Sequence, residues 1–331
     1  MTNNAFSRLA PFVREYIYEK RWDRLRDIQE AALAALLDGE DNILIAAGTA
    51  SGKTEAAFFP VLSLIPGGDT ASISVLYIGP LKALINDQFE RLTELLQRGT
   101  IPLWRWHGDV DDRYKKKFLA CPSGILQITP ESLEALLLRH PEKIKSIFSG
   151  LRFIMIDEVH AFMGSDRGSQ LLCQTARIEA EALCSPRRIG LSATLGDYSQ
   201  ALRWLGLGSG RKTSLIQEKE QKRRVRLALD YFPGKDEAAY YETLYAQCRG
   251  KKCIIFTNSR LEAEETVNVL RGMAARKGDG DFFHIHHGSV SGRLRMDAER
   301  ELREEEGPRT AAATATLELG IDLGRLDRII Q

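Results

Sequence analysis

Hydrophobic positions from residue 41 onward form short continuous apolar runs, separated by longer stretches in which apolar residues recur at helical spacing. Continuous rather than alternating runs predict strands buried on both faces, as in a parallel sheet covered by helices. The predicted strands of the first half are 43–47, 73–78, 102–106, 125–128, 153–156 and 188–191. Helical spacing is clearest at 81–96 and 131–138. This pattern predicts an α/β, doubly wound parallel-sheet domain with ligands at the carboxyl ends of its strands.

A polar, basic and glycine-containing segment at 206–224 interrupts this rhythm, which then restarts. The elements predicted for the second half are strands at 225–232, 253–256, 282–286 and 310–313, a last strand near Ile329, and helices at 236–248, 261–275 and 293–306. We therefore expect four parts. These are an N-terminal helical segment at 1–40, a first domain at 41–208, a linker at 209–223 and a second domain at 224–331.

Composition narrows the class of protein. A length of 331 residues suits two cores, and 44% hydrophobic with 27% charged residues is ordinary for a globular protein. No apolar run is long enough to cross a bilayer, and Met1–Asn4 lacks the basic start of a secretory signal, so we expect a cytoplasmic protein without a membrane partner. The 46 basic and 45 acidic residues give no indication of a polyanionic partner, and five scattered cysteines predict no metal site.

A phosphate-binding loop is predicted where the first strand ends. Its residues are Gly48, Thr49, Ala50, Ser51, Gly52, Lys53 and Thr54. Backbone N–H groups and the positive end of the next helix would bind phosphates, Lys53 would add a charge for the outer phosphates, and Thr54 would offer its hydroxyl to Mg²⁺. Ala47 stands where the general G-x-x-x-x-G-K-[ST] pattern has glycine. For this segment alone, an ordinary strand-to-helix turn is the alternative.

Two adjacent carboxylates, Asp157 and Glu158, follow the apolar run 153–156. The carboxyl ends of parallel strands share one edge, so we expect this pair beside the phosphate loop. Asp157 would hold Mg²⁺ and Glu158 would deprotonate the attacking water. An acidic pair can instead stabilise the next helix N-terminus, but the presence of Lys53 favours catalysis. Residues 192–194, which follow the run 188–191, either sense the metal site or cap a helix.

The ordered set of motifs resembles the motor core of superfamily 2 helicases of the DEAD/DEAH-box type. Its members are Leu25–Gln29, 47–54, Pro80–Leu84, Thr129–Ser132, Asp157–His160, Ser192–Thr194, Ile255–Arg260, His287–Ser289 and Thr314–Asp322. Within the superfamily, three segments are most similar to the Lhr (large helicase-related) branch: Pro80–Gln88, His286–Ser289 and Leu317–Asp322. The resemblance covers nearly the whole chain and implies two RecA-like domains in tandem.

This resemblance implies ATP and Mg²⁺ as cofactors, and it assigns further roles. Gln29 would read the adenine, while Gly320 and Asp322 would approach the nucleotide from the second domain. The residues that would couple the nucleotide state to domain movement are His160, Ser192 and Thr194. The residues that match contacts to the nucleic-acid backbone are Lys82, Thr129, Arg260 and Thr314. Trp104 and Trp106 are candidates for stacking on bases, although we expect core packing for at least one.

The implied activity is ATP hydrolysis coupled to movement on, or unwinding of, DNA, with RNA as the alternative strand. Contacts to the backbone predict binding that salt weakens. The family continues past the position of Gln331 to a motif whose arginines contribute ~10³ or more in rate, so we expect an incomplete second domain and further domains or subunits. Two other functions stay open. One is a nucleotide- and nucleic-acid-binding fragment without turnover, and the other is a non-unwinding motor subunit of a defence or restriction complex.

Overall fold

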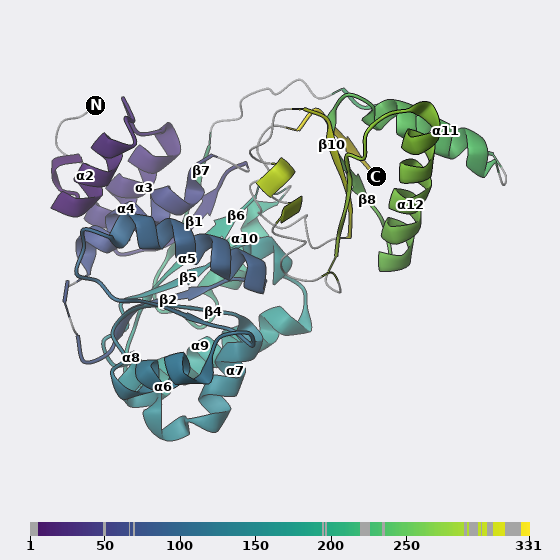
Figure 1. The fold of residues 1–331 in the computed structure, drawn as a ribbon. Coiled ribbons are helices and arrows are strands. Elements are labelled where there is room, and N and C mark those ends of the chain that lie inside the picture. Colours follow the sequence, from purple (N-terminus) through teal and green to yellow (C-terminus); the bar gives the residue numbers. More distant parts are fainter. Residues whose placement is uncertain are drawn as a thin grey trace. The chain divides into compact units, whose positions relative to one another are not determined.

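A computed structural model describes residues 6–48, 51–65, 67–68, 70–193, 195, 197–218, 226–233, 236–287, 290, 297–298, 300–302, 307–314 and 326–331. Contacts divide the chain into two compact units, residues 1–220 and 221–331, and each contains one parallel sheet (Figure 1). The predicted α/β class with two parallel sheets in tandem is confirmed. Along the described ranges, no helix is both long and apolar enough to span a bilayer.

The first unit is built on a seven-stranded parallel sheet in the order β3-β4-β2-β5-β6-β1-β7. Its strands are β1 (Asn42–Ala46), β2 (Ile73–Ile78), β3 (Leu103–Trp106), β4 (Gly124–Ile128), β5 (Phe153–Ile156), β6 (Arg187–Ser192) and β7 (Thr213–Gln217). Every residue of β1, β2, β4, β5 and β6 is buried. Continuous apolar runs therefore mark central strands here, because both faces of the sheet are covered.

Helices cover both faces of this sheet (Figure 1). In β2, Tyr77 packs with the core on one face, and Leu76 packs with the core on the other. The helices on the Tyr77 face are α2 (Pro11–Glu19), α3 (Asp27–Asp38), α4 (Lys53–Leu64) and α5 (Lys82–Leu96). Those on the Leu76 face are α6 (Asp112–Ala120), α7 (Pro130–Arg139), α8 (Ile144–Phe148), α9 (Asp166–Ala182) and α10 (Tyr198–Gly206). Short 3₁₀ turns occupy η1 (Pro141–Lys143) and η2 (Val159–Ala161).

Strand β7 corrects the expected linker at 209–223. Thr213–Gln217 pairs in parallel with β1, from Asn42 opposite Thr213 to Ala46 opposite Gln217. Only Ile216 of this strand is buried, so its sequence has no continuous apolar run that would predict it. The first sheet therefore extends beyond the expected boundary at 208.

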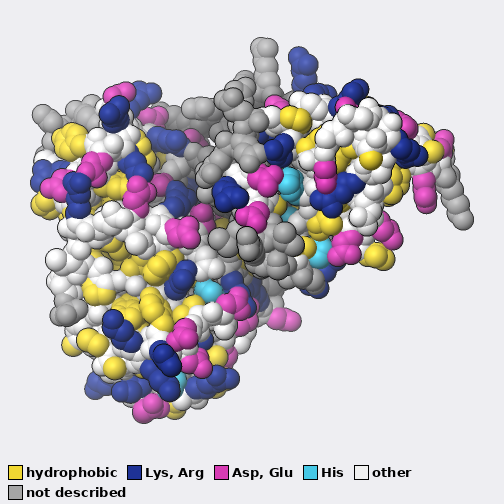
Figure 2. All heavy atoms as spheres, viewed as in Figure 1, with side chains coloured by type: hydrophobic (Ala, Val, Ile, Leu, Met, Phe, Trp, Pro, Cys, Tyr) yellow, Lys and Arg dark blue, Asp and Glu magenta, His cyan; other side chains and the backbone are white. Residues whose placement is uncertain are grey.

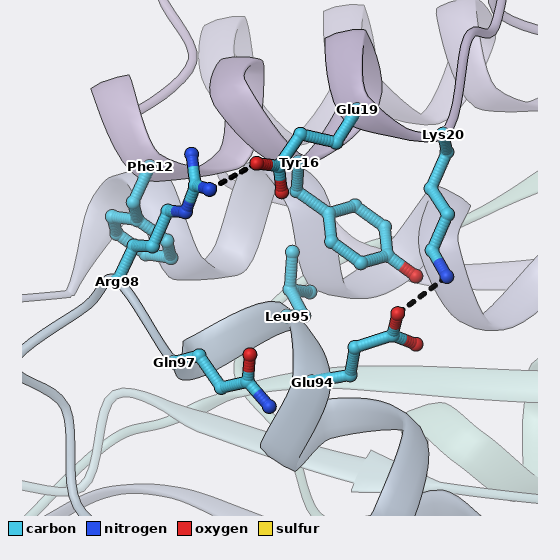
Figure 3. A pocket seen from close by; sticks show the side chains of 8 residues that line it. All are labelled: Phe12, Tyr16, Glu19, Lys20, Glu94, Leu95, Gln97 and Arg98. Atoms are coloured by element: carbon cyan, nitrogen blue, oxygen red, sulfur yellow. Dashed lines mark hydrogen bonds and ion pairs between the residues drawn. The ribbon is translucent and has the colours of Figure 1, made fainter.

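The N-terminal helices belong to the first unit, because their apolar faces join its core. In α2, Val13 and Ile17 are buried. A pocket between α2 and the end of α5 is lined by charged side chains, with Lys20 Nζ 2.5 Å from Glu94 Oε1 and Arg98 paired with Glu19 (Figure 3). These ion pairs are more than one-third exposed and contribute little stability, so the apolar face holds α2 in place.

The second unit contains a four-stranded parallel sheet in the order β11-β8-β10-β9. Its described elements are β8 (Lys252–Phe256), β9 (Phe283–His286), β10 (Arg309–Ala313), β11 (Arg328–Ile330), α11 (Glu237–Cys248) and α12 (Arg260–Lys277). Leu244 of α11 and Leu270 of α12 share one buried apolar cluster with Ile255 of the sheet. Most of the helix predicted at 293–306 lies outside the described residues.

The strand predicted at 225–232 is wrong over its described part. Residues 226–232 form neither helix nor strand, and Leu227 and Leu229 are 93% and 94% exposed. Its alternating apolar positions are typical of a strand, but a strand also needs a neighbour that completes the hydrogen-bond ladder. Among the described residues, the first strand of the second sheet is β8, which begins at Lys252.

Candidate functional site

The carboxyl end of β1 leads through the predicted phosphate loop into α4. Gly52 is the N-cap of α4 and has φ of 82°, a left-handed conformation that favours glycine. Lys53 Nζ donates to the carbonyl oxygen of Ala47 at 2.9 Å, and the buried Ser51 Oγ has no hydrogen-bond partner among the described residues. Amide groups at a helix N-terminus, an ammonium group and a free hydroxyl therefore meet at one strand end, an arrangement that suits an anion. Thr49 and Ala50 lie outside the described residues.

Gln29 lies directly against this loop. Its side chain is buried in α3, where Oε1 accepts from the Arg26 amide at 2.9 Å. Its Nε2 lies 3.4 Å from the carbonyl oxygen of Gly52, and a Cβ added to Gly52 would come within 2.5 Å of this nitrogen. The predicted adenine-reading residue is thus beside the phosphate loop, although its role toward adenine stays a prediction.

Asp157 and Glu158 lie at the carboxyl end of β5, and each is 6% exposed. The Asp157 carboxylate accepts hydrogen bonds from the Tyr77 hydroxyl and, at 2.9 Å, from the Glu158 amide. Burial raises the pKa of Asp157, and it also raises the pKa of Glu158 to about 7, with the Asp157 charge as the second cause. Lys53 opposes both increases in pKa. The site therefore holds a buried acidic pair that additional positive charge would stabilise.

Strand β6 lies between β1 and β5, and it brings two predicted coupling residues to the same place. His160 Nδ1 lies 3.3 Å from Glu158 Oε2 and 3.3 Å from Ser192 Oγ, at the end of β6. Burial lowers the pKa of His160, and the charge of Lys53 lowers it further. One imidazole nitrogen thus lies close to both the acidic pair and the end of β6. Thr194, the third predicted coupling residue, lies outside the described residues.

The residues predicted to bind Mg²⁺ offer oxygen atoms, the ligands that this ion prefers. The Thr54 hydroxyl accepts from Gln88 Nε2 at 3.3 Å, and Asp157 is held by Tyr77. A buried carboxylate pair whose pKa values are both raised fits a divalent cation, because the cation would offset the charge that burial disfavours. Sequence reasoning missed both supporting residues. Gln88 could have been found as a polar residue on the apolar face of a helix, but Tyr77 lies in an apolar run and carries no such signal.

The ends of β2 and β4 bring together two residues predicted to contact nucleic acid. A hydrogen bond of 3.1 Å from the Gly79 amide to the Ile128 carbonyl joins these ends, with Lys82 and Thr129 just beyond them. Lys82 Nζ, half-exposed at the start of α5, pairs with Asp109 Oδ1 at 2.8 Å. The structure thus gives Lys82 an acidic partner that the sequence pattern did not predict.

Both candidate stacking residues pack inside the first unit. The rings of Trp104 and Trp106 lie 5.5 and 5.6 Å from that of Phe118, between ring centres. Trp106 is buried and Trp104 is half-buried. Core packing was expected for at least one of these residues, and both pack in the core.

In the second unit, Arg260 and Thr314 follow the neighbouring strands β8 and β10. Arg260 is the first residue of α12, whose N-cap Ser259 accepts from the Glu262 amide through its hydroxyl at 3.1 Å. Both residues therefore lie at the carboxyl edge of the second sheet. Gly320 and Asp322 lie outside the described residues.

Lys and Arg side chains are mixed with Asp and Glu over the visible face of each unit, in keeping with a formal net charge of +1 (Figure 2). Any affinity for a polyanion must therefore come from local placement at strand ends and not from the overall field.

A parallel sheet with a Gly-Lys-Thr helix start and a strand-end acidic pair is typical of P-loop nucleotide-binding domains. The sequence model of one such family, the DEAD/DEAH box helicases, matches residues 26–202, more than half of the chain. The chain belongs to the DEAD/DEAH box helicase family.

Relatives of the Lhr branch are among the proteins to which this chain is similar, as the motifs predicted. The chain is 28% identical to the ATP-dependent helicase Lhr-Core of Methanocaldococcus jannaschii, over 96% of this chain and 39% of that protein. It is 30% identical to the Lhr helicase/uracil glycosylase of Escherichia coli, over 88% of this chain and 23% of that one. The structure of the Mycobacterium smegmatis helicase Lhr bound to ssDNA and AMP-PNP is similar with a TM-score of 0.81 and 28% identity, covering 99% of this chain and 44% of that chain. This chain thus spans less than half of each of these relatives.

Proposed function

We propose that the chain is the ATP-driven motor core of a cytoplasmic helicase or translocase that moves on a strand of DNA, with RNA as the alternative. The observation that carries this proposal is the order of functional residues along one sheet edge. Lys53 and Asp157 follow β1 and β5, and Ser192 is the last residue of β6, which lies between these two strands. Lys82 and Thr129 follow β2 and β4. Nucleotide and nucleic-acid residues thus occupy neighbouring halves of the same edge, divided between β5 and β2.

In this proposal each nucleotide-site residue has a distinct task. The ammonium of Lys53 leaves the Ala47 carbonyl and pairs with the outer phosphates, while the amides at the start of α4 bind the phosphate oxygens. Glu158 accepts the proton of the attacking water, which its carboxylate can do only when ionised. His160 holds Glu158 and Ser192 within 3.3 Å of one imidazole nitrogen. Mg²⁺, when bound by Thr54 and Asp157, would neutralise developing phosphate charge.

The choice of DNA is supported by the M. smegmatis relative, whose structure contains ssDNA and an ATP analogue. Because the relatives are more than twice as long as the part matched here, we also propose that further domains or subunits complete the motor. Arginines supplied from there would reach the γ-phosphate, a contribution of ~10³ or more in rate. Gly320 and Asp322 would face the nucleotide from the second domain, and Arg260 and Thr314 would contact the nucleic-acid backbone.

Binding of a non-hydrolysable ATP analogue tests the nucleotide site. We expect Lys53→Ala to weaken binding about tenfold or more, because a charged hydrogen bond to phosphate is lost. Titration calorimetry in the presence of Mg²⁺ measures this change. Lys116→Ala, on an exposed position of α6, is the matched control and should bind like the wild-type protein. Equal affinity of Lys53→Ala and wild type would refute the assignment of the loop.

The ion pair between Lys82 and Asp109 predicts a gain of function toward nucleic acid. Replacing Asp109 with Asn removes a carboxylate 2.8 Å from the Lys82 ammonium, so the ammonium becomes available to a phosphate. We expect tighter binding of oligo(dT) and a salt dependence that is steeper by about one released counterion. Fluorescence anisotropy at several salt concentrations measures both quantities. The matched control is Asp112→Asn on α6, and an unchanged salt slope for Asp109→Asn would exclude Lys82 as a phosphate contact.

A further inference from the structure

Arg167, the second residue of α9, contacts two segments beside residues that the proposed function assigns to nucleic acid: the turn before α5 and the first turn of α7. Its Nη2 donates to the Pro80 carbonyl oxygen at 2.6 Å. Its Nε and Nη2 also lie 2.5 and 3.0 Å from the two carboxylate oxygens of Glu131. Pro80 is two residues before Lys82, and Glu131 is two residues after Thr129. One guanidinium group therefore fixes the spacing of these two segments, with a fork geometry that an ammonium group cannot reproduce.

The same residue is joined to the acidic segment of the nucleotide site through Phe162. The Arg167 guanidinium lies 5.3 Å from the centre of the Phe162 ring, which is fully buried two residues after His160. The Phe162 carbonyl accepts from the Ser165 hydroxyl at 2.7 Å, and this hydroxyl accepts from the Gly168 amide at 3.1 Å. A short, hydrogen-bonded segment thus connects the acidic pair to the start of α9.

This connecting segment has little room for independent movement. A Cβ added to Gly168 would lie 1.9 Å from the Phe162 carbonyl oxygen, so the two backbones are in close contact. The Phe162 ring is stacked on Trp204 at 6.3 Å between ring centres, with an angle of 4° between the planes. Close-packed interiors transmit displacement rather than absorb it. A shift of residues 157–160 should therefore displace Phe162 and the start of α9 together.

We propose that Arg167 is a positioning residue that couples the nucleotide site to the proposed nucleic-acid residues at the starts of α5 and α7. Its guanidinium carries a displacement of the acidic segment to Pro80 and Glu131, and so to Lys82 and Thr129. The role is geometric, because Glu131 is 62% exposed and an ion pair at such a position contributes little stability. The inference rests on the proposed function, since it requires both ligands to bind.

The test measures energetic coupling in the 331-residue protein, so it does not depend on hydrolysis. Affinity for labelled oligo(dT) is determined with and without AMP-PNP and Mg²⁺, and affinity for the nucleotide with and without oligo(dT). Each pair of titrations must give the same coupling factor, which we expect to be about fivefold or more for the wild-type protein. Arg167→Ala should reduce this factor to about one, with the affinity for nucleotide alone unchanged. A purely structural role would weaken binding without changing the factor.

Three variants complete the experiment. Arg177→Ala is the matched control, because Arg177 lies on the same helix and, within the described residues, forms its ion pair with Glu181 at 2.7 Å. It should keep the full coupling factor. Arg167→Lys should restore part of the coupling, and Glu131→Gln, at an exposed position, should lower it even if Arg167→Ala does not fold.

The outcomes separate the inference from the function on which it rests. Failure of the wild-type protein to bind either ligand would overturn the proposed function. Two other outcomes would overturn only the role of Arg167. In one, the wild-type protein binds both ligands without coupling. In the other, Arg167→Ala and Glu131→Gln keep the full coupling factor.

Discussion

Replacing Glu158 with Gln is expected to lower nucleic-acid-stimulated ATP hydrolysis by a factor of about 10² to 10⁴, the usual contribution of a general base. Gln has nearly the same volume but cannot take a proton from water. ATP binding should persist, because the substitution removes a negative charge from a site that is already crowded with buried carboxylates. Phosphate release with and without oligo(dT), together with analogue binding, measures the two effects separately.

The matched control is Glu181→Gln on an exposed part of α9, which should hydrolyse ATP like the wild-type protein. Hydrolysis by Glu158→Gln at the wild-type rate would exclude Glu158 as the base. If the wild-type chain binds ATP and oligo(dT) but releases no phosphate, the nucleotide-binding fragment without turnover becomes the better description.

Replacing Arg188 with Ala is expected to destabilise the first unit by about 3 kcal/mol or more, as when one partner of a buried ion pair is removed. Arg188 is 1% exposed in β6. Its Nη1 donates to the carbonyl oxygens of Leu205 and Leu207 at 3.2 and 2.6 Å, and its Nη2 pairs with Glu179 Oε1 at 2.9 Å. The substitution leaves these acceptors without their donor and opens a cavity between α9, α10 and the sheet.

Tryptophan fluorescence during urea unfolding measures this loss, because Trp22, Trp104, Trp106 and Trp204 all lie in the first unit. Its transition can therefore be followed without a contribution from the second unit. Arg203→Ala, on the exposed face of α10, is the control and should change the midpoint little. A midpoint for Arg188→Ala equal to that of the wild type would contradict the structural role of this arginine.

Residues with an uninterrupted apolar pattern were predictable as strands, because burial on both faces requires such a pattern. Strands β2, β4 and β5 lie within a residue of their expected ranges. Strand β7 was not predictable, since an edge strand has one neighbour and Thr213–Gln217 needs few apolar residues. Residues 226–232 show the reverse error, because their alternating pattern has no described strand to pair with. The hydrophobic pattern of a segment indicates how its residues are buried. Whether the segment pairs with another strand depends on the rest of the fold.

The gathering of Lys53, Asp157 and Ser192 at one edge could also be predicted, because parallel strands share their carboxyl ends. The contacts that hold these residues in place could not be predicted from the sequence. Tyr77 is an ordinary aromatic residue by sequence, and its hydrogen bond to Asp157 exists only because β2 and β5 are neighbours. Nothing in the sequence distinguishes Arg167 from the other arginines, because its contact with Glu131 exists only where α7 and α9 pack together. Supporting residues depend on three-dimensional neighbours that no local motif records.

The backbone of Glu158 is strained. Its φ of 48° and ψ of 53° place a residue with a full side chain in the left-handed region, which costs of order 1 kcal/mol. A glycine at this position would relieve that strain and remove a buried carboxylate at the same time, so the fold would gain stability as the site lost its proton acceptor. Selection for stability and selection for turnover therefore oppose each other at a single residue. A stabilised variant that changes Glu158 should be regarded as an inactivated motor rather than an improved one.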